Sequence, residues 1–213
     1  MTTASDAMRE IFRIADMRLG NAQPRPAIFP RYDGPVIRQT DQVRVASLMH
    51  WGFLLPQVSA KTGKSIMPKA VNNARDDKLQ SSSFWRASFT SRRCLVPASS
   101  FCEAKGLNPA TYFWFGLAAN DPDARPPFAF GGIWNTYRGE YRGEFVDIET
   151  YSIVTTTPNV LVQQVHPDRM PVILDPADHE QWLDGDVKDA AALIKPFPAE
   201  AMRIVKSGAD KTD

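Results

Sequence analysis

The sequence predicts an α+β fold in which an antiparallel or mixed β-sheet curls into a barrel-like core with peripheral helices. Six to eight runs rich in β-branched and aromatic residues are separated by turn-forming or polar stretches, and helical patterns cluster near the chain ends. With 213 residues, 43% hydrophobic and 23% charged types, the composition is typical of a globular protein rather than a disordered one. At roughly 150 residues per domain, we expect a single domain over residues 1–213.

The first elements follow from periodicity and proline placement. Residues 5–17 carry Met8, Ile11, Phe12 and Ile14 at helical spacing, which predicts a helix capped by Ser5 or Asp6. Four prolines exclude regular structure from residues 21–35. Two strands, 35–40 and 43–56, should form a hairpin about a turn at residues 40–42.

The rest of the chain alternates strands and short helices. Residues 57–69 are expected to form a loop, residues 70–79 have no clear period, and residues 81–93 predict a short helix capped by serines. Expected strands are 94–104, 111–119, 127–137, 147–157, 170–174 and 202–206. Expected helical segments are 158–166, 176–183 and 187–194.

Charge and cysteine content limit the classes of function. Lys and Arg number 25 against 24 Asp and Glu, so a nucleic acid would have to be held by a local basic patch. The two cysteines form neither a disulfide framework nor a metal-binding spacing, so we expect no metal and no cofactor. The chain shows neither a signal peptide nor a membrane span, which favours a cytoplasmic protein without a membrane partner.

Four groups of residues are candidates for chemistry. His166 precedes Pro167, Asp168 and Arg169, so a titratable ring lies in a rigid, charged loop. His50 is expected to be half-buried and His179 solvent-exposed, both in structural roles. Glu103 ends an apolar strand, where partial burial would raise its pKa for proton transfer; an ordinary strand-end carboxylate is the alternative. The other candidates are Asn72 and Asn73 with Arg75, and Arg86, Arg92 and Arg93 with Trp85, each of which is also compatible with ordinary surface structure.

A thiol hydrolase using Cys102 and His166 is a further alternative, because the two residues need only be adjacent in space. Cys102, however, lies in an apolar run, where an inert buried thiol is the usual finding.

The order of five motifs is more specific than any of them alone. The series is HWGFLLP at residues 50–56, NNAR at 72–75, SFWRASFTSRRCLVPASSFCEA at 83–104, YSIVTTTPN at 151–159 and VHPDRMPVIL at 165–174. This series resembles the SOS-response-associated peptidase (SRAP) family of abasic-site processing proteins, over about two thirds of the chain.

The resemblance implies an SRAP-like fold that binds single-stranded DNA and forms a covalent crosslink to abasic sites. In that family the cysteine after the initiator methionine supplies an α-amine and a thiol. The amine condenses with the aldehyde of the ring-opened sugar, and the thiol closes a thiazolidine ring. The resemblance also implies self-processing at the N-terminus, abasic-site lyase activity and a role in the SOS response. We expect a monomer.

By position, the resemblance assigns Asn73 to hydrogen bonding near the crosslink, Glu103 to proton transfer and His166 to Schiff-base and ring-opening chemistry. Arg75 matches the arginine that binds the DNA backbone. Trp51 and Pro56 match positions that shape the DNA-facing wall, and Arg86 is a further expected DNA contact.

Three features depart from the family pattern. Two residues separate His166 from Arg169 where many members have one, and the loop after Pro56 lacks the tryptophans that some members use as a stacking wedge. Position 2 is Thr2, and no cysteine precedes Cys94. Two interpretations follow: the chain starts at an internal methionine, which the retained Asn73, Arg75, Glu103 and His166 favour, or it is a degenerate member that binds DNA without crosslinking.

Overall fold

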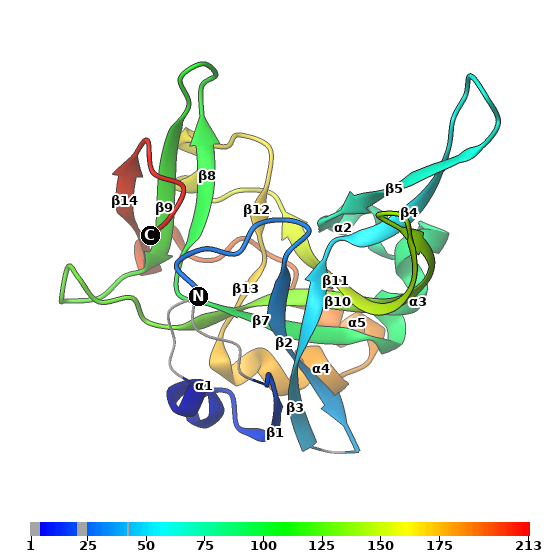
Figure 1. Ribbon diagram of the computed structural model, residues 1–213. Coiled ribbons are helices and arrows are strands. Elements are labelled where there is room, and N and C mark those ends of the chain that lie inside the picture. Colours follow the sequence, from blue (N-terminus) through cyan, green and yellow to red (C-terminus); the bar gives the residue numbers. More distant parts are fainter. Residues whose placement is uncertain (1–4, 21–24, 42) are drawn as a thin grey trace.

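A computed structural model describes residues 5–20, 25–41 and 43–213 (Figure 1). Five strands form a closed, barrel-like sheet: β2 (Asp33–Thr40), β3 (Val43–Trp51), β7 (Arg93–Ala98), β10 (Phe128–Tyr141) and β11 (Glu144–Thr156). Their order is β3-β2-β7-β10-β11, and a parallel pairing of β11 with β3 closes the ring at Tyr151 and Trp51. The predicted barrel-like core is therefore confirmed, and the predicted hairpin is β2–β3.

Shorter strands extend this sheet. The parallel partners are β1 (Ile14–Arg18) on β3 and β6 (Asn73–Arg75) on β11. The antiparallel partners are β12 (Met170–Pro171) on β11 and β13 (Ile173–Leu174) on β10.

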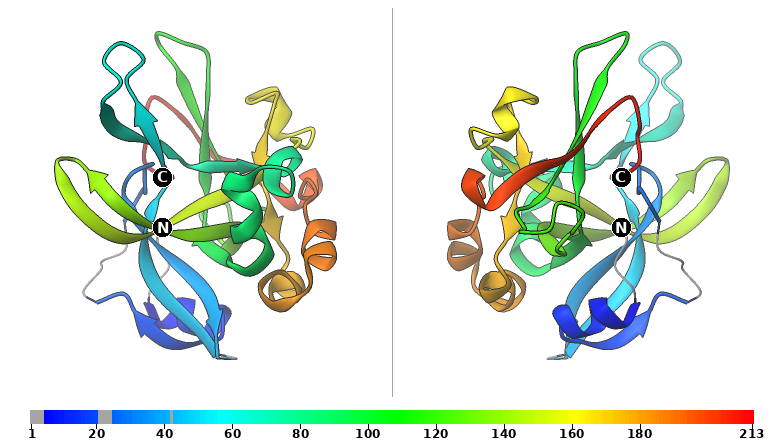
Figure 2. Two further views of the ribbon diagram at one scale, coloured as in Figure 1. Left: turned by 90° about the vertical axis from the view of Figure 1, so that its right-hand side faces the viewer. Right: turned by 90° about the vertical axis from the view of Figure 1, so that its left-hand side faces the viewer.

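Two further sheets project from the barrel (Figures 1 and 2). One is the hairpin of β4 (Phe53–Val58) and β5 (Ser65–Val71). The other has the order β14-β9-β8 and comprises β8 (Phe101–Lys105), β9 (Thr111–Leu117) and β14 (Met202–Gly208).

The helices are short, and most lie along one side of the barrel (Figure 2). They are α1 (Ser5–Ile11), α2 (Asp76–Leu79), α3 (Ser83–Ser91), α4 (His179–Asp184) and α5 (Val187–Ala192). Three single 3-10 turns span Val162–Gln164, Pro176–Asp178 and Ala199–Ala201. The serine cap predicted for residues 81–93 is present, because the Ser82 side chain accepts a hydrogen bond from the Phe84 amide.

The strands of the barrel separate two apolar clusters because successive side chains point to opposite faces. On β11, Val154 packs in a cluster with residues of α1, α3, α4 and α5, such as Trp182. Tyr151 and Ile153 belong to a second cluster, which includes Phe101 and Phe115 from the β8–β9 hairpin. The second cluster adjoins the cavity described below.

Several predicted elements are wrong in part. The strands expected at 43–56 and 94–104 are each two strands, interrupted at residue 52 and at residues 99–100. The helix expected over residues 5–17 ends at Ile11, because Arg13 takes a positive φ of 53° and residues 14–18 pair with β3 instead. The loop expected at 57–69 contains the end of β4 and most of β5, so the described chain has more strands than the six to eight expected. The helix expected at 158–166 is a single 3-10 turn. No helix among the described residues is long and apolar enough to cross a membrane.

Candidate active site

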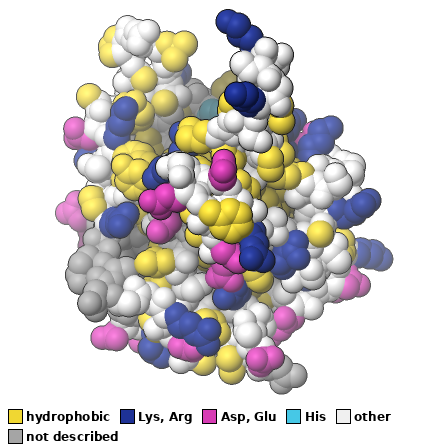
Figure 3. Space-filling view, turned by 45° about the vertical axis from the view of Figure 1, so that its right-hand side comes forward, with side chains coloured by type: hydrophobic (Ala, Val, Ile, Leu, Met, Phe, Trp, Pro, Cys, Tyr) yellow, Lys and Arg dark blue, Asp and Glu magenta, His cyan; other side chains and the backbone are white. Residues whose placement is uncertain are grey.

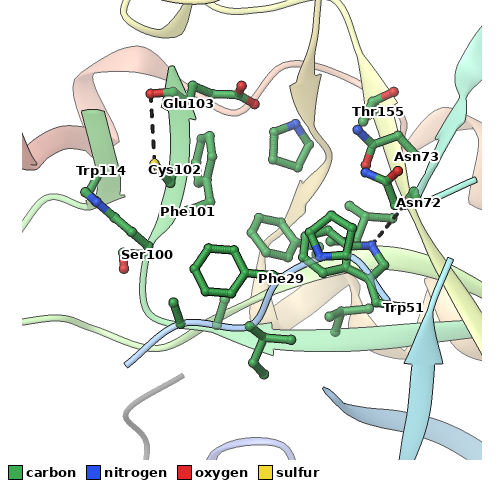
Figure 4. A pocket seen from close by; sticks show the side chains of 18 of the residues that line it. Phe29, Trp51, Asn72, Asn73, Ser100, Phe101, Cys102, Glu103, Trp114 and Thr155 are labelled. Carbon is green, nitrogen blue, oxygen red and sulfur yellow. Dashed lines mark hydrogen bonds between the residues drawn. The ribbon is translucent and has the colours of Figure 1, made fainter. Parts of the chain in front are cut away.

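A cavity of about 720 Å³ lies beside the second apolar cluster, between the barrel and the β8–β9 hairpin. Its lining includes five of the seven residues to which the family resemblance assigns a role, namely Trp51, Asn73, Arg75, Glu103 and His166. These residues come from four separate stretches of the chain. The fold therefore places the predicted chemistry around one cavity (Figure 4).

One wall is built by β6 and β11. Asn73 pairs with Ile153 in a parallel register, and strand alternation buries Ala74 in the core while Asn73 and Arg75 line the cavity. The guanidinium of Arg75 binds Asp77, with Nε 3.0 Å from Oδ1, at the exposed rim. Asn73 therefore offers an amide to a ligand inside the cavity, and Arg75 offers a cation at its edge.

Trp51 contributes an aromatic surface at the point where the barrel closes. Its ring stacks on Tyr151 with centroids 6.1 Å apart and planes 9° from parallel, and its Nε1 donates to the Asn72 carbonyl at 3.1 Å. Tyr151 is fully buried, so it fixes the orientation of Trp51. A flat ring held in this way suits stacking against a nucleobase or a sugar.

Glu103 faces Asn73 across the cavity. Its side chain extends from β8 toward the wall that carries Asn72, Asn73 and Thr155 (Figure 4). Burial raises the pKa of the Glu103 carboxyl above its ordinary value, although His166 acts in the opposite direction. Glu103 thus keeps its proton to higher pH than a solvated carboxyl, which suits a proton donor.

His166 is fixed through one ring nitrogen. The amide of Arg169 donates to Nδ1 at 3.2 Å, and the Arg169 carbonyl oxygen lies 3.0 Å from the same nitrogen. Because Nδ1 is held by the backbone of this turn, Nε2 is the nitrogen left for a ligand. Two residues separate His166 from Arg169, and with this spacing the backbone of Arg169 reaches Nδ1 of His166.

An ion pair holds the His166 turn against the Asn73 wall. Arg169 Nη2 lies 2.6 Å from Asp76 Oδ1 and also donates to the Thr155 carbonyl, while Asp76 Oδ2 accepts from Thr156 at 2.8 Å. Sequence reasoning missed Asp76 and Thr155. Asp76 directly follows the NNAR motif, but nothing in the sequence indicates that its partner is 93 residues away.

Both cysteines are poor nucleophiles. Burial, followed by the nearby Glu103 charge, raises the pKa of Cys102 to about 11, so its thiol stays protonated at neutral pH. Cys94 is completely buried, which raises its pKa further. The environment of Cys102 therefore argues against a thiol hydrolase.

Two predicted DNA contacts lie away from the cavity. Pro56 is exposed on β4 and borders a separate hollow of about 340 Å³. The chain turns away from β3 at Gly52, which has a φ of 122°. Arg86 is exposed on α3, whose inner face packs Trp85 and Phe89 into the core. Their roles in DNA binding stay predictions.

The remaining histidines are buried. His50 lies 3.3 Å from the Tyr141 hydroxyl through Nε2 and 3.4 Å from Asp33 through Nδ1, which fits the structural role expected for it. The solvent exposure expected for His179 is wrong: it is 2% exposed and stacks on Phe12, because it begins α4 on the helix face that packs inward. Both histidines lie outside the cavity lining.

Comparison with known proteins gives consistent matches. The family model described as SOS response associated peptidase (SRAP) matches residues 1–209. The chain is 32% identical over 161 residues to the abasic site processing protein YoqW of Bacillus subtilis, covering 72% of this chain and 65% of that protein. It is 33% identical over 160 residues to the abasic site processing protein YobE of the same organism, covering 72% and 67%. The chain thus spans about two thirds of the length of these relatives.

Solved structures show the same fold. A Bordetella bronchiseptica protein superposes with a TM-score of 0.72 at 25% identity, covering 98% of this chain and 96% of that one. A Bacteroides thetaiotaomicron protein has a TM-score of 0.62 at 24% identity, covering 81% and 72%.

Proposed function

The chain belongs to the SOS response associated peptidase (SRAP) family, and from this premise we propose that it processes abasic sites in single-stranded DNA. The observation that carries the proposal is the convergence of Asn73, Glu103 and His166 on one cavity, where burial raises the pKa of the Glu103 carboxyl. The names of YoqW and YobE, both abasic site processing proteins, support the same substrate class.

The cavity offers the groups that an abasic sugar requires. The ring-opened sugar carries an aldehyde, and an amine nitrogen that attacks this carbon gives a carbinolamine. Glu103 then donates its proton to the carbinolamine hydroxyl, which leaves as water, and the resulting iminium returns its N–H proton to the Glu103 carboxylate to give the imine. Asn73 orients the sugar by hydrogen bonding, and Nε2 of His166 exchanges a proton with the ring oxygen during ring opening.

The proposal has two forms, which differ in whether an amine of the protein attacks the sugar. In the first form, an N-terminal cysteine supplies the α-amine and then closes the thiazolidine ring with its thiol, and the protein processes its own N-terminus. Position 2 here is Thr2, which lies outside the described residues. In the second form, the cavity binds the abasic site without a covalent bond.

The distribution of charged side chains favours recognition of DNA by the cavity over attraction of DNA by the overall charge of the protein. On the face shown in Figure 3, Lys and Arg side chains are interspersed with Asp and Glu, and the formal net charge is only +1. Nonspecific attraction to DNA is then weak, and selectivity depends on the site itself.

The test compares two single-stranded oligonucleotides that differ at one position, an abasic site or a thymidine. Fluorescence anisotropy should show tighter binding of the abasic strand by about tenfold, or ~1.4 kcal/mol. Asn73→Ala should remove this preference, and the exposed Lys188→Ala, remote from the cavity lining, should keep it. Equal affinity of the native protein for both strands would refute the proposal.

A denaturing gel of the same mixtures separates the two forms. A protein–DNA band that survives denaturant and is lost on Glu103→Gln would establish covalent capture. Preferential binding without such a band would establish the non-covalent form for the chain with threonine at position 2.

A further inference from the structure

We propose that Lys211 and Tyr112 form a subsite for a backbone phosphate of the nucleotide next to the abasic one. This inference rests on the proposed function and adds a contact beyond Asn73, Glu103 and His166. Residues 210–213 also lie beyond the part of the chain that the family model matches, which ends at residue 209.

Lys211 differs from the other cations of the cavity in its charge balance. Arg75 is paired with Asp77 at 3.0 Å and Arg169 with Asp76 at 2.6 Å. Within the described part of the chain, no carboxylate lies within 4.0 Å of Lys211 Nζ, which instead lies 5.3 Å from the centre of the Tyr112 ring. Lys211 therefore brings an uncompensated positive charge to the lining of the cavity.

The two acidic side chains beside Lys211 each have another cationic partner. Asp213 also lines the cavity, but its carboxylate binds Arg125 with distances of 3.1 and 3.3 Å. Asp210 lies 3.6 Å from the amine of Lys206. The carboxylates of Asp210 and Asp213 therefore repel an anion at Lys211 only weakly.

The backbone that carries Lys211 is anchored on both sides. Trp114 Nε1 donates to the Asp210 carbonyl at 3.3 Å, and Lys206 Nζ donates to the Thr212 carbonyl at 2.8 Å. The Arg125–Asp213 pair holds the following residue. Fixing this segment before a ligand arrives lowers the entropy that binding would otherwise cost.

The subsite lies on the other face of β8 from Glu103. In the β8–β9 register, Glu103 is opposite Phe113, whereas Ala104 is opposite Tyr112, so Tyr112 and Glu103 point to opposite faces. Figure 4 shows the same division, with Cys102 and Trp114 on one side of β8 and Phe101 and Glu103 on the other. The cavity borders both faces of this edge strand.

A DNA strand with its abasic sugar at Glu103 can therefore continue around β8 to Lys211. An amine attracts a phosphate as a point charge, and the Tyr112 ring beside it offers an apolar surface to the adjoining sugar or base. A single-stranded DNA backbone provides a phosphate with each nucleotide, which matches this combination.

The test measures the affinity of Lys211→Ala for single-stranded DNA that carries a tetrahydrofuran abasic analogue, at several salt concentrations. We expect a several-fold loss of affinity and a slope of log K against log salt that is smaller by about 0.7, the loss of one phosphate contact. Lys211→Arg should retain most of the affinity. Lys188→Ala, an exposed change outside the cavity lining, should match the native protein.

Single methylphosphonate substitutions then locate the contact. Neutralising one phosphate beside the lesion should remove the penalty of Lys211→Ala, whereas neutralising distant phosphates should not. An unchanged affinity and salt slope for Lys211→Ala would overturn the subsite, and so would a penalty independent of methylphosphonate position. If the native protein binds abasic and intact strands equally while Lys211 still affects both, the proposed function fails and the phosphate subsite stands.

Discussion

Glu103 shows how the fold produces a chemical property from one ordinary side chain. The residue leaves β8 toward the cavity, and burial among apolar neighbours disfavours its charged form. The nearby ring of His166 limits this effect without reversing it. Cys102, the preceding residue on β8, also has a raised pKa, but a raised pKa makes a thiol less reactive, whereas it keeps a carboxyl protonated, and so able to donate a proton, up to a higher pH.

The raised pKa of Glu103 predicts a pH-dependent effect of Glu103→Gln on stability. Because the folded state holds this proton more tightly, the group favours folding below its ordinary pKa, and this contribution is lost as pH rises through the raised folded value. Glutamine does not titrate. The free energy of unfolding of Glu103→Gln, relative to the native protein, should therefore increase from pH 4 to pH 7.

Urea unfolding at the two pH values measures this difference. Asp147→Asn, a change in an exposed ion pair on β11, serves as the control and should show little pH-dependent difference. A difference for Glu103→Gln that is constant with pH, or that shrinks toward pH 7, would contradict the burial of the carboxyl.

At the scale of the elements, the site depends on close contacts between strands. Gly34 on β2 lies against Tyr151 on β11, and a Cβ added at Gly34 would stand 2.6 Å from the Tyr151 hydroxyl oxygen. Tyr151 is 2% exposed and supports the ring of Trp51. The absence of a side chain at Gly34 thus allows the aromatic pair that borders the cavity.

Gly34→Ala should lower the free energy of unfolding by about 1–3 kcal/mol, because the buried Tyr151 cannot move away freely. Affinity for abasic DNA should fall as well, since Trp51 loses its support. Gly139→Ala is the matched control on β10, where the nearest atom is the hydroxyl of the less buried Tyr137. Equal stability of Gly34→Ala and the native protein in urea unfolding would rule out this tight contact.

The same scale shows which elements can be predicted from sequence. Sequence predicts the strands that are rich in β-branched and aromatic residues, which are β9, β10, β11 and β14. Sequence does not predict the β4–β5 hairpin, because Ile66 and Met67 are both exposed and β5 therefore lacks an alternation between apolar and polar positions. The end of α1 cannot be predicted either, because the residue with a positive φ is Arg13 rather than a glycine or asparagine.

At the scale of the whole molecule, the closed barrel brings distant segments to one cavity. The β3–β11 pairing places Trp51 beside Tyr151, and the β6–β11 pairing places Asn73 two residues further along the same strand. Periodicity in the sequence cannot reveal these parallel pairings. The order of five motifs was enough to name candidates that prove to line one cavity, whereas the Asp76–Arg169 pair and the position of Lys211 required the three-dimensional arrangement.

The most direct test of the account locates the abasic sugar on the molecule by nuclear magnetic resonance. The protein, labelled with nitrogen-15, is titrated with single-stranded DNA carrying an abasic site and then with the matched thymidine strand. The side-chain amide of Asn73 and the backbone amides of Glu103 and His166 should shift with the abasic strand and much less with the intact one. Shifts confined to the β4–β5 hairpin or to α3, with the Asn73 amide unchanged, would contradict the claim that this cavity receives the lesion.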